Sequence, residues 1–509
     1  MGAFFSLNTG LTNDEWHEQR NWEFNVALFK HLLFQVEMES VFVNYPDKYY
    51  GIGFHIISQP IQFFLSKIIL SLQNIDNYGA LLLSKHFVIF ISFFTSGIFV
   101  YLIISKVIKN KFFNYSATFL YLLYPYLLGH GLYNPKDTPF LCFWIVCTYF
   151  SVNMFDKASK EKAIQYRDIA LLSCLSAFLL SIRITGILIF IQYFITFIIF
   201  LNTEKFSFIY FFKLNFKRIL LFISLTSLIT YLLYPVFWKN PLLIFDAIDY
   251  MSKHFNNVCT LTLSKCMFSK NLDSAYIPIW LSVKLPLLIL IGLILLPFTE
   301  KKIFVNKSSN ITFGTILVSA LFIPAIMIFK KVHLYDELRQ VLFLVPLIFI
   351  LGIISIYIFS KKIFYFLAFI TLLIFFIENI KIYPYQYVWF NTPARVLDLS
   401  KNFELDYWGV SGKELALNVS KLNEKTSKKP CILAAPIFSV KAFLDSNLYS
   451  CFGFWGEIDT DFPRPFWAIQ NVRNLKKGKS YKCSSVYESK FSLLFSDEDI
   501  ITGRVVKCI

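Results

Sequence analysis

The sequence predicts a polytopic α-helical membrane protein with a small α/β domain at its C-terminal end. Hydrophobic residues make up 56% of the 509 residues and charged residues only 16%, whereas charged residues are about 25% of an average soluble domain. Apolar runs near the ~20 residues that a bilayer requires recur between positions 81 and 379. After position 380, glycine, proline and charged residues return. We therefore divide the chain into residues 1–80, 81–379 and 380–509.

The net charge of +16 does not indicate nucleic acid as a partner. Most lysines and arginines lie in short loops between apolar runs, where they set the orientation of the spans and contact anionic lipid head groups. We therefore expect a membrane, and no nucleic acid, around this chain.

Residues 1–80 contain no clean spanning segment. Phe24–Phe34 has one apolar face and predicts an amphipathic helix. Tyr49–Leu72 is apolar but is interrupted by glycine, proline, histidine and glutamine. We interpret both segments as helices that lie at the membrane interface; a tilted span is the alternative for Tyr49–Leu72.

From Leu81 onward the apolar runs are well separated, and we predict ten spans, each near the length that a bilayer requires. They cover residues 81–105, 112–131, 137–154, 168–183, 185–201, 219–237, 278–298, 310–329, 338–359 and 363–379.

Basic loops fix the predicted orientation. Clusters of lysine and arginine follow every second span, beginning with the first, and such loops stay in the cytoplasm. We therefore expect a multi-pass protein of the cytoplasmic (inner) membrane, with residues 1–80, the polar turns described below and residues 380–509 on the extracytoplasmic face. The clusters contain Lys106, Lys109, Lys111, Lys157, Lys160, Lys162, Arg167, Lys205, Lys213, Lys217, Arg218, Lys301, Lys302, Lys307, Lys361 and Lys362.

The N-terminal region creates a topological problem. Residues 1–80 can lie outside only if a span precedes them, and Met1–Gly10 is too short to span. We expect that a first helix is missing from the sequence as given. The alternative is that Tyr49–Leu72 spans the membrane and that the residues before it lie inside.

Residues 380–509 form the predicted outer α/β domain. Cys431–Ile437 and Gly503–Cys508 have the short apolar pattern that is typical of strands. Three cysteines lie in predicted spans, and six lie in segments predicted to be outside. An even external set suits disulfides in an oxidising compartment. Of these six, Cys259 and Cys266 are the plausible local pair; a zinc site is the alternative, although no suitable ligand spacing supports it.

An acidic pair near the N-terminus is the first candidate for chemistry. Asp14 and Glu15 are adjacent in the segment that we place on the outer face. A carboxylate there could take a proton from an acceptor hydroxyl. The alternative is a solvated helix start, in which Asn13 or Asp14 caps a helix that begins near Trp16.

Two further polar features interrupt the apolar runs. Lys136 and Asp137 follow the second predicted span; the alternative there is a proline-rich turn in which Asp137 caps the next helix. Arg183 lies within an apolar run, where an arginine is costly and usually has a partner or an anion. The alternative for Arg183 is an interfacial side chain that extends toward water.

A third polar turn precedes the ninth predicted span and carries His333, Asp336 and Arg339. Together the three features place basic side chains on the face that holds the acidic pair. A lipid phosphate as leaving group requires arginine or lysine, and a hydroxyl nucleophile requires a base. The combination indicates transfer from a lipid-borne donor at the edge of the membrane.

Four blocks of sequence then carry a family resemblance. They are Asp14–Glu15, Asn134–Phe140, His333–Arg339 leading into a span with Pro346, and Tyr383–Asn391 followed by Glu404–Gly409. In this order along the chain they resemble the bacterial polyprenyl-phosphate-dependent glycosyltransferases of the GT-C superfamily, and are similar to glycosyltransferase family 39 and the protein O-mannosyltransferases. The resemblance extends over nearly the whole chain.

The resemblance implies a GT-C fold, a polyprenyl-phosphate sugar as donor, a site on the outer face and an inverting transfer of a hexose or pentose. By the resemblance, Asp14 matches the general base with Glu15 beside it, and Arg339 matches a phosphate contact. The chain departs from the family pattern at Glu337, where a glycine is expected. The resemblance implies no certain cofactor and leaves the role of a divalent metal open. The expected substrate-binding set is Lys136, Asp137, Arg183, His333, Asp336 and Arg339.

Two other functions fit part of this pattern. A transporter or flippase for a lipid-linked sugar would share the basic pocket but would not require the acidic pair; internal repeats, which would favour it, are not seen in the sequence. A catalytically inactive membrane scaffold is the second alternative. The acceptor stays open between protein, lipid A, a cell-wall polymer and another glycolipid.

Overall fold

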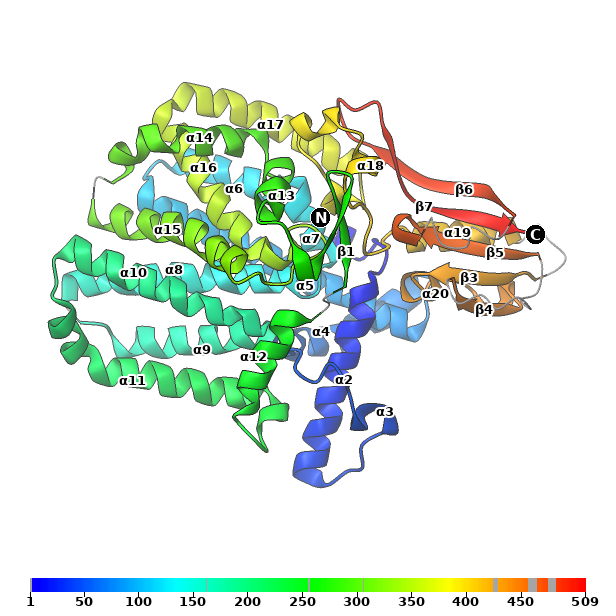
Figure 1. Cartoon of the computed structure of the whole chain (residues 1–509), viewed down its shortest axis with the longest axis horizontal. Coiled ribbons are helices and arrows are strands. Elements are labelled where there is room, and N and C mark those ends of the chain that lie inside the picture. Colours follow the sequence, from blue (N-terminus) through cyan, green and yellow to red (C-terminus); the bar gives the residue numbers. More distant parts are fainter. Residues whose placement is uncertain are drawn as a thin grey trace.

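The computed structural model describes residues 2–161, 163–254, 257–304, 306–423, 429–455, 465–474 and 482–509. It consists of a bundle of long helices with a mixed β-sheet at one end of the bundle (Figure 1). The predicted fold class, a polytopic helical protein with a small C-terminal α/β domain, is confirmed.

Seven helical segments among the described residues are long and apolar enough to cross a membrane. An eighth span exists if the bent pair α13 (Tyr276–Lys284) and α14 (Leu287–Ile303) is counted as one. The seven are α5 (Asn77–Val107), α8 (Asp137–Glu161), η1 with α10 (Ile184–Glu204), α11 (Phe208–Leu233), α15 (Lys307–Phe329), η4 with α16 (Arg339–Phe359) and α17 (Lys361–Lys381).

Three of the ten predicted spans are not single long helices. The segment 112–131 is two helices, α6 (Lys111–Leu123) and α7 (Pro125–Tyr133), because Pro125 lacks an N–H and opens a new helix. The segment 278–298 bends by 118° between α13 and α14. Pro286 lies immediately before the first residue of α14. The segment 168–183 is α9 (Tyr166–Ile182), whose 17 residues lie at the lower limit of the length of a span.

The basic clusters that follow the first, third, fifth and seventh predicted spans meet at one end of the bundle. Lys106 Nζ lies 2.5 Å from Asp156 Oδ2, which also accepts a hydrogen bond from Ser308 at 2.8 Å. Lys307 Nζ lies 2.7 Å from Glu204 Oε2. These contacts join the ends of α5, α8, α10 and α15 at the end opposite the sheet (Figure 1).

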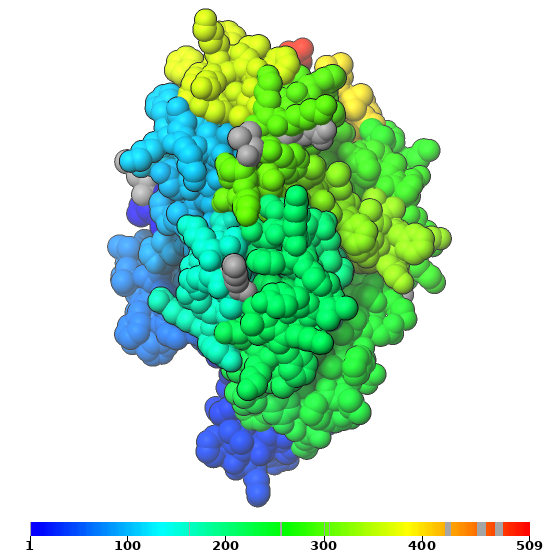
Figure 2. All heavy atoms as spheres, turned by 90° about the vertical axis from the view of Figure 1, so that its left-hand side faces the viewer, coloured from blue at the N-terminus to red at the C-terminus, as the bar shows by residue number. Residues whose placement is uncertain are grey.

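The N-terminal segment crosses the other end of the bundle. It contains α1 (Gly2–Ser6), α2 (Asn13–Phe34), α3 (Ser40–Val43) and α4 (Gly53–Leu72). The α2–α3 tip, dark blue, projects beyond the outline of the bundle (Figures 1 and 2). Helix α4 is continuous through Pro60 and is not among the helices long and apolar enough to cross a membrane. Our interpretation of residues 1–80 as interfacial stays a prediction.

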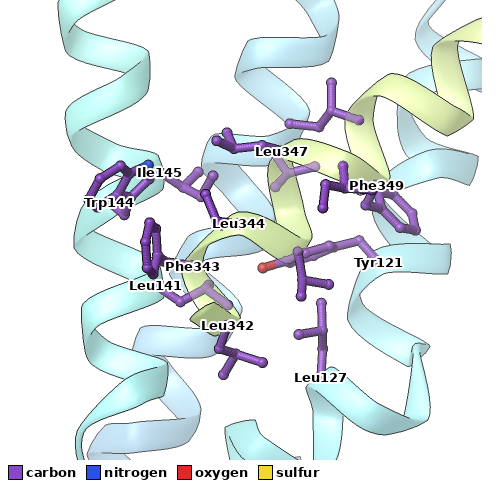
Figure 3. Packing of buried hydrophobic residues seen from close by; sticks show 14 of the residues in the cluster. Tyr121, Leu127, Leu141, Trp144, Ile145, Leu342, Phe343, Leu344, Leu347 and Phe349 are labelled. Carbon is purple, nitrogen blue, oxygen red and sulfur yellow. The ribbon is translucent and has the colours of Figure 1, made fainter. Parts of the chain in front are cut away.

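The core of the bundle surrounds η4 (Arg339–Leu344) and α16 (Val345–Phe359). Leu342, Phe343 and Leu344 insert between α7 and α8, where Phe343 packs against Trp144 with ring centroids 4.2 Å apart (Figure 3). Every residue of α16 from Val345 to Tyr357 is buried. Close packing of this kind leaves little freedom to the backbone that carries Arg339.

A mixed sheet in the order β4-β3-β5-β7-β6 forms the C-terminal domain. Strand β3 is parallel to β4 and β5, and β7 is antiparallel to β5 and β6. The predicted strands at 431–437 and 503–508 are confirmed as β3 and the end of β7. The elements are α18 (Leu399–Asn402), α19 (Gly412–Asn423), β3 (Cys431–Ala435), α20 (Phe438–Lys441), β4 (Cys451–Phe454), β5 (Phe466–Asn471), β6 (Cys483–Ser492) and β7 (Asp499–Cys508).

A small hairpin links the bundle to this domain. It follows α12 (Leu243–Lys253) and consists of β1 (Cys259–Thr262) and β2 (Lys265–Phe268). A disulfide joins Cys259 to Cys266, as predicted, and two more join Cys431 to Cys451 and Cys483 to Cys508. The backbone N–H of Glu404 donates to the Leu261 carbonyl at 2.8 Å. The hairpin therefore connects the long 239–277 loop to the segment that precedes α19.

Candidate active site

Arg339 is the centre of a charged cluster at the end of the bundle that carries the sheet. It is the buried first residue of η4, and its guanidinium contacts three carboxylates through its three nitrogens. Nε lies 3.3 Å from Asp137 Oδ2, Nη1 lies 3.2 Å from Asp336 Oδ2, and Nη2 forms an ion pair with Asp14 Oδ2. The fold thus brings together three of the four sequence blocks.

Asn134 orients Asp137 toward this cluster. The Asn134 side-chain oxygen accepts hydrogen bonds from the backbone N–H groups of Lys136 at 3.2 Å and Asp137 at 2.9 Å. Asn134 therefore organises the turn before α8, and the alternative in which Asp137 serves as the cap is wrong. The buried Asp137 carboxylate instead forms ion pairs with Arg339 and Arg183. Arg183 has the partner that an arginine in an apolar run requires.

Asp336 connects the cluster to the C-terminal domain. Its Oδ1 lies 2.5 Å from Arg473 Nη2, and its backbone N–H donates to Thr260 Oγ1 at 2.9 Å. Arg473 Nε in turn lies 2.9 Å from Glu404 Oε1. Both Asp336 and Glu337 have a positive φ, 55° and 64°. This left-handed backbone favours glycine, and Glu337 stands at the position where we expected one.

Asp14 is the most accessible carboxylate of the cluster. Its side chain is 32% exposed, compared with 2% for Asp137 and 6% for Asp336. Helix α2 begins at Asn13 instead of near Trp16, so Asp14 lies in its first turn and not at its cap. The Trp408 indole N–H donates to Asp14 Oδ2 at 3.2 Å.

A close approach between two loops sets the position of Asp14. The Asn13 backbone N–H donates to the Trp408 carbonyl at 3.2 Å. A Cβ on Gly10 would lie 2.2 Å from the Val410 carbonyl oxygen, so only glycine permits this approach. The fourth sequence block therefore places Trp408 and the start of α2 side by side.

Glu15 lies in a different environment from its neighbour Asp14. It is fully buried, and its Oε1 accepts from the Thr12 backbone N–H at 2.7 Å. Its Oε2 lies 2.9 Å from His86 Nε2 of α5. Glu15 therefore fixes the first turn of α2 against the bundle, and both of its oxygens are occupied.

Lys136 lies beside the cluster in a compensated ion pair. Its Nζ is 2.8 Å from Glu18 Oε1 and 3.9 Å from the centroid of the Tyr50 ring. Burial lowers the pKa of Lys136, and the Glu18 carboxylate opposes that shift. Lys136 is therefore near the cluster without a direct contact to Arg339 in the described part of the chain.

His333 is the one expected site residue that the described structure leaves outside the cluster. Its Nδ1 is buried and lacks a hydrogen-bond partner among the described residues. The described contacts of Asp14, Asp137 and Arg339 do not include it. The other expected residues either form the cluster or lie directly beside it.

A second buried pair supports the turn that contains Asp336 and Glu337. Lys284, the last residue of α13, lies with its Nζ 3.0 Å from Glu337 Oε1, and both side chains are fully buried. The Lys284 ammonium also lies 3.8 Å from the centroid of the Phe390 ring. Burial raises the pKa of Glu337 to about 8, although Lys284 opposes the shift. This pair holds the strained turn that presents Asp336 and Arg339.

Sequence reasoning missed several members of the site. Arg473, Glu404 and Gln340 complete the network, since Gln340 Oε1 accepts from Arg183 Nη2. Trp408 lies in the fourth block, so the resemblance could have indicated it. Arg473 follows β5 and belongs to none of the four blocks. Only the tertiary fold reveals its contact with Asp336.

An apolar cavity of about 810 Å³ is lined mainly by α9, α10 and α11, with further residues from α8 and α12. Leu180 and Ile184, which precede and follow Arg183 in the sequence, line it. Ile187 and Phe194 line it as well and are exposed on the surface of the bundle. The cavity therefore extends from the neighbourhood of Arg183 toward the surface that faces lipid. Its lining contains no charged residue.

Metal ligands do not gather in the described part of the chain, where no group of three or more His, Cys, Asp or Glu side chains could hold a metal ion. In the cluster itself, each carboxylate of Asp14, Asp137 and Asp336 already faces a guanidinium. The residues present therefore support charge stabilisation by arginine.

Comparison with known proteins finds matches among solved structures. No protein-family model matches the chain, and no curated protein matches it significantly in sequence. Among solved structures, the chain is similar along 99% of its length to ArnT from Cupriavidus metallidurans in the apo state, with a TM-score of 0.47, 11% identity and 95% of that chain covered. The crystal structure of the same protein bound to undecaprenyl phosphate gives a TM-score of 0.45, 11% identity and 96% coverage.

Proposed function

We propose that this protein is a membrane glycosyltransferase that moves a sugar from a polyprenyl-phosphate donor to an acceptor hydroxyl. The observation that carries the proposal is the pairing of an accessible carboxylate, Asp14, with a buried guanidinium, Arg339. Base and phosphate ligand meet at one end of the bundle, and the apolar cavity reaches Leu180 and Ile184 near Arg183. We place this end on the extracytoplasmic face because the basic clusters meet at the opposite end.

The donor phosphate binds where the arginines converge. Arg339 and Arg183 share the Asp137 carboxylate, so their guanidinium groups lie on either side of one anion. A phosphate oxygen suits such donors because a guanidinium presents parallel N–H groups. The polyprenyl tail then lies in the apolar cavity, whose wall includes Leu180 and Ile184 next to Arg183.

The transfer itself is a single displacement. Asp14 accepts the proton of the acceptor hydroxyl while that oxygen attacks the anomeric carbon of the sugar. The bond between the anomeric carbon and the phosphate oxygen breaks, and polyprenyl phosphate leaves with the bonding electron pair. Arg339 and Arg183 stabilise the charge that develops on the leaving phosphate. Attack on the face opposite the leaving group inverts the anomeric centre.

Glu15 acts in this mechanism as a positioning residue. Its two oxygens hold the Thr12 backbone and His86, which fixes the helical turn that presents Asp14. The Trp408 indole, which donates to Asp14, orients the base from the C-terminal domain. The base thus stands on a helix end that the bundle and the C-terminal domain clamp together.

The experiment that tests the proposal uses membranes that contain the full chain and a panel of radiolabelled polyprenyl-phosphate hexoses and pentoses. We expect one donor to lose its label to a lipid, glycan or protein fraction, with release of polyprenyl phosphate. Asp14→Asn membranes with equal protein content serve as the control. If no donor in the panel is consumed faster than in membranes that lack the protein, the proposal is wrong. Movement of intact donor across the bilayer, equal in the wild type and the Asp14→Asn protein, would indicate a flippase instead.

A further inference from the structure

We propose that the donor phosphate activates the base by displacing Asp14 from Arg339. This inference rests on the proposed function and deepens it. It makes the Asp14–Arg339 pair the resting state of the site and assigns Arg473 as a positioning residue, because Arg473 keeps Asp336 in place.

Arg339 has no free nitrogen to offer a phosphate. Its Nε, Nη1 and Nη2 are each engaged by a different carboxylate, those of Asp137, Asp336 and Asp14. The Trp408 ring lies against the guanidinium as well, with its centroid 5.1 Å from the guanidinium carbon. A donor phosphate therefore competes with these three carboxylates for Arg339.

Asp14 is the carboxylate that can leave. Asp137 and Asp336 are almost completely buried, whereas a third of the Asp14 side chain is exposed. Each buried carboxylate also has a second cation, Arg183 for Asp137 and Arg473 for Asp336. Among the described residues, Arg339 is the only cation that pairs with Asp14, whose other partner is the neutral Trp408 indole.

The charge of the network supports the same exchange. Four carboxylates face three guanidinium groups in the connected set, so a phosphate added to the intact network would meet an excess of negative charge. Release of one carboxylate removes that obstacle. The set consists of Asp14, Asp137, Asp336 and Glu404 with Arg183, Arg339 and Arg473.

The exchange couples donor binding to catalysis. A guanidinium in an ion pair favours the charged form of a carboxylate and so opposes proton uptake. When the phosphate takes Arg339, Asp14 is freed to accept the acceptor proton. The backbone at Asp14 stays fixed through Glu15 and Asn13, so the movement is a rotation of one side chain. The base is then available only when a donor is present.

The test measures the binding of undecaprenyl phosphate to the purified full-length protein in nanodiscs. In the wild type, Asp14 competes with the phosphate for Arg339. We therefore expect Asp14→Asn to bind undecaprenyl phosphate more tightly, by about two- to five-fold, since a partly exposed ion pair contributes up to about that much. Turnover of the same variant should be lost, so affinity and activity move in opposite directions.

Two matched variants separate exchange from a general change of charge. Asp336→Asn removes the same charge from the buried side of the same guanidinium, and Asp47→Asn removes a partly buried charge that pairs with His17 and His254 instead of Arg339. We expect neither to tighten binding by more than half of the Asp14→Asn effect. Equal tightening in Asp14→Asn and Asp47→Asn would overturn the exchange, as would unchanged or weaker binding in Asp14→Asn. If Asp336→Asn fails to fold, the Asp47→Asn comparison alone decides.

Failure of the proposed function would look different. If the wild type binds undecaprenyl phosphate no better than phosphatidic acid, the donor class itself is wrong. If the wild type binds undecaprenyl phosphate selectively and Asp14→Asn does not bind it more tightly, the donor class stands and only the exchange is wrong.

Discussion

Asp14 and Arg339 are 325 residues apart in the sequence and form an ion pair at the end of the bundle that carries the C-terminal domain. One comes from the first turn of α2 and the other from the start of η4. The packing of η4 against α8 holds Arg339, and the loop containing Trp408 holds the start of α2. The pair therefore forms only when both ends of the chain are in place. It also gives Asp14 a role that its neighbour Glu15 does not share.

We expect substitutions of the two adjacent carboxylates, Asp14 and Glu15, to have different effects. Asp14→Asn removes a proton acceptor at nearly constant size, so turnover should fall by roughly 10²–10⁴-fold. Thermal unfolding of the purified protein should change little. A helix-cap role would instead predict a stability loss of about 0.5–2 kcal/mol with activity per folded molecule retained. Sugar transfer at the wild-type rate by folded Asp14→Asn protein would disprove the catalytic role.

Glu15→Gln is the companion experiment. Glu15 is buried and accepts hydrogen bonds from the Thr12 N–H and from His86, so the variant should lower the unfolding temperature and disturb turnover less than Asp14→Asn does. A Gln amide keeps one acceptor for the Thr12 N–H but removes the charge that faces His86. If Glu15→Gln abolishes transfer while its unfolding temperature equals that of the wild type, Glu15 is the base and Asp14 is not.

Substitution of Arg339 should weaken donor binding. Arg339→Ala removes the central cation and leaves Asp14, Asp137 and Asp336 without it, so the protein should also be less stable, because unpaired buried charges are costly. Arg339→Lys keeps a charge but loses the planar set of donors. In a donor titration, we expect the KM of Arg339→Lys to rise more than its kcat falls. Unchanged KM in both variants would exclude a phosphate contact.

The sequence predicts the helices and polar turns that carry the site better than it predicts the contacts between them. Apolar runs and basic loops define most spans because length and charge act locally. Two of the three spans that differ do so at Pro125 and Pro286, where the loss of a backbone donor interrupts a helix. Both prolines are visible in the sequence, but apolar runs continue through them and hide the breaks.

Contacts between distant segments could not be derived in this way. Asp14 and Glu15 look alike in the sequence, and only the position of His86 on α5 shows that Glu15 faces inward. Arg473 lies beyond every recognised block, and its pairing with Asp336 depends on how the sheet docks on the hairpin. His333 stands within a block yet lies outside the cluster, and the left-handed residues Asp336 and Glu337 stand between it and Arg339.

Topology can be tested with an impermeant thiol reagent in intact cells. We expect a cysteine introduced at Lys160 to stay unlabelled and one introduced at Lys331 to react, because Lys160 belongs to the basic end and Lys331 precedes the active-site turn. Permeabilised cells should label both positions and serve as the control. Labelling of the cysteine at position 160 in intact cells would show that the predicted orientation in the membrane is wrong.

The external cysteines should be oxidised in the mature protein. The structure pairs Cys259 with Cys266, Cys431 with Cys451 and Cys483 with Cys508, and disulfides persist in oxidising compartments. Peptide mass mapping without reduction should recover these three pairs, whereas the three cysteines in α8 and α9 should be alkylated after denaturation. Free thiols at all six external positions would contradict the outer placement of the domain.

The buried Glu337 carboxyl should make stability depend on pH. Burial raises the pKa of Glu337 to about 8 in the folded protein, whereas an unperturbed glutamate has a pKa near 4.3. Between these values the folded state binds more protons than the unfolded state, so the free energy of unfolding contributed by this group decreases as pH rises. The contribution is fully present below about pH 4 and is lost as pH rises through about 8.

Glu337→Gln keeps the shape of the side chain but does not titrate, so its unfolding temperature should fall less between pH 5.5 and 8.5 than that of the wild type. Glu23→Gln, at a partly exposed position of α2 beside Arg20, is the control and should follow the wild type. If Glu337→Gln shows the same pH dependence as the wild type, Glu337 is ionised throughout this range and the Lys284–Glu337 contact is a fixed ion pair.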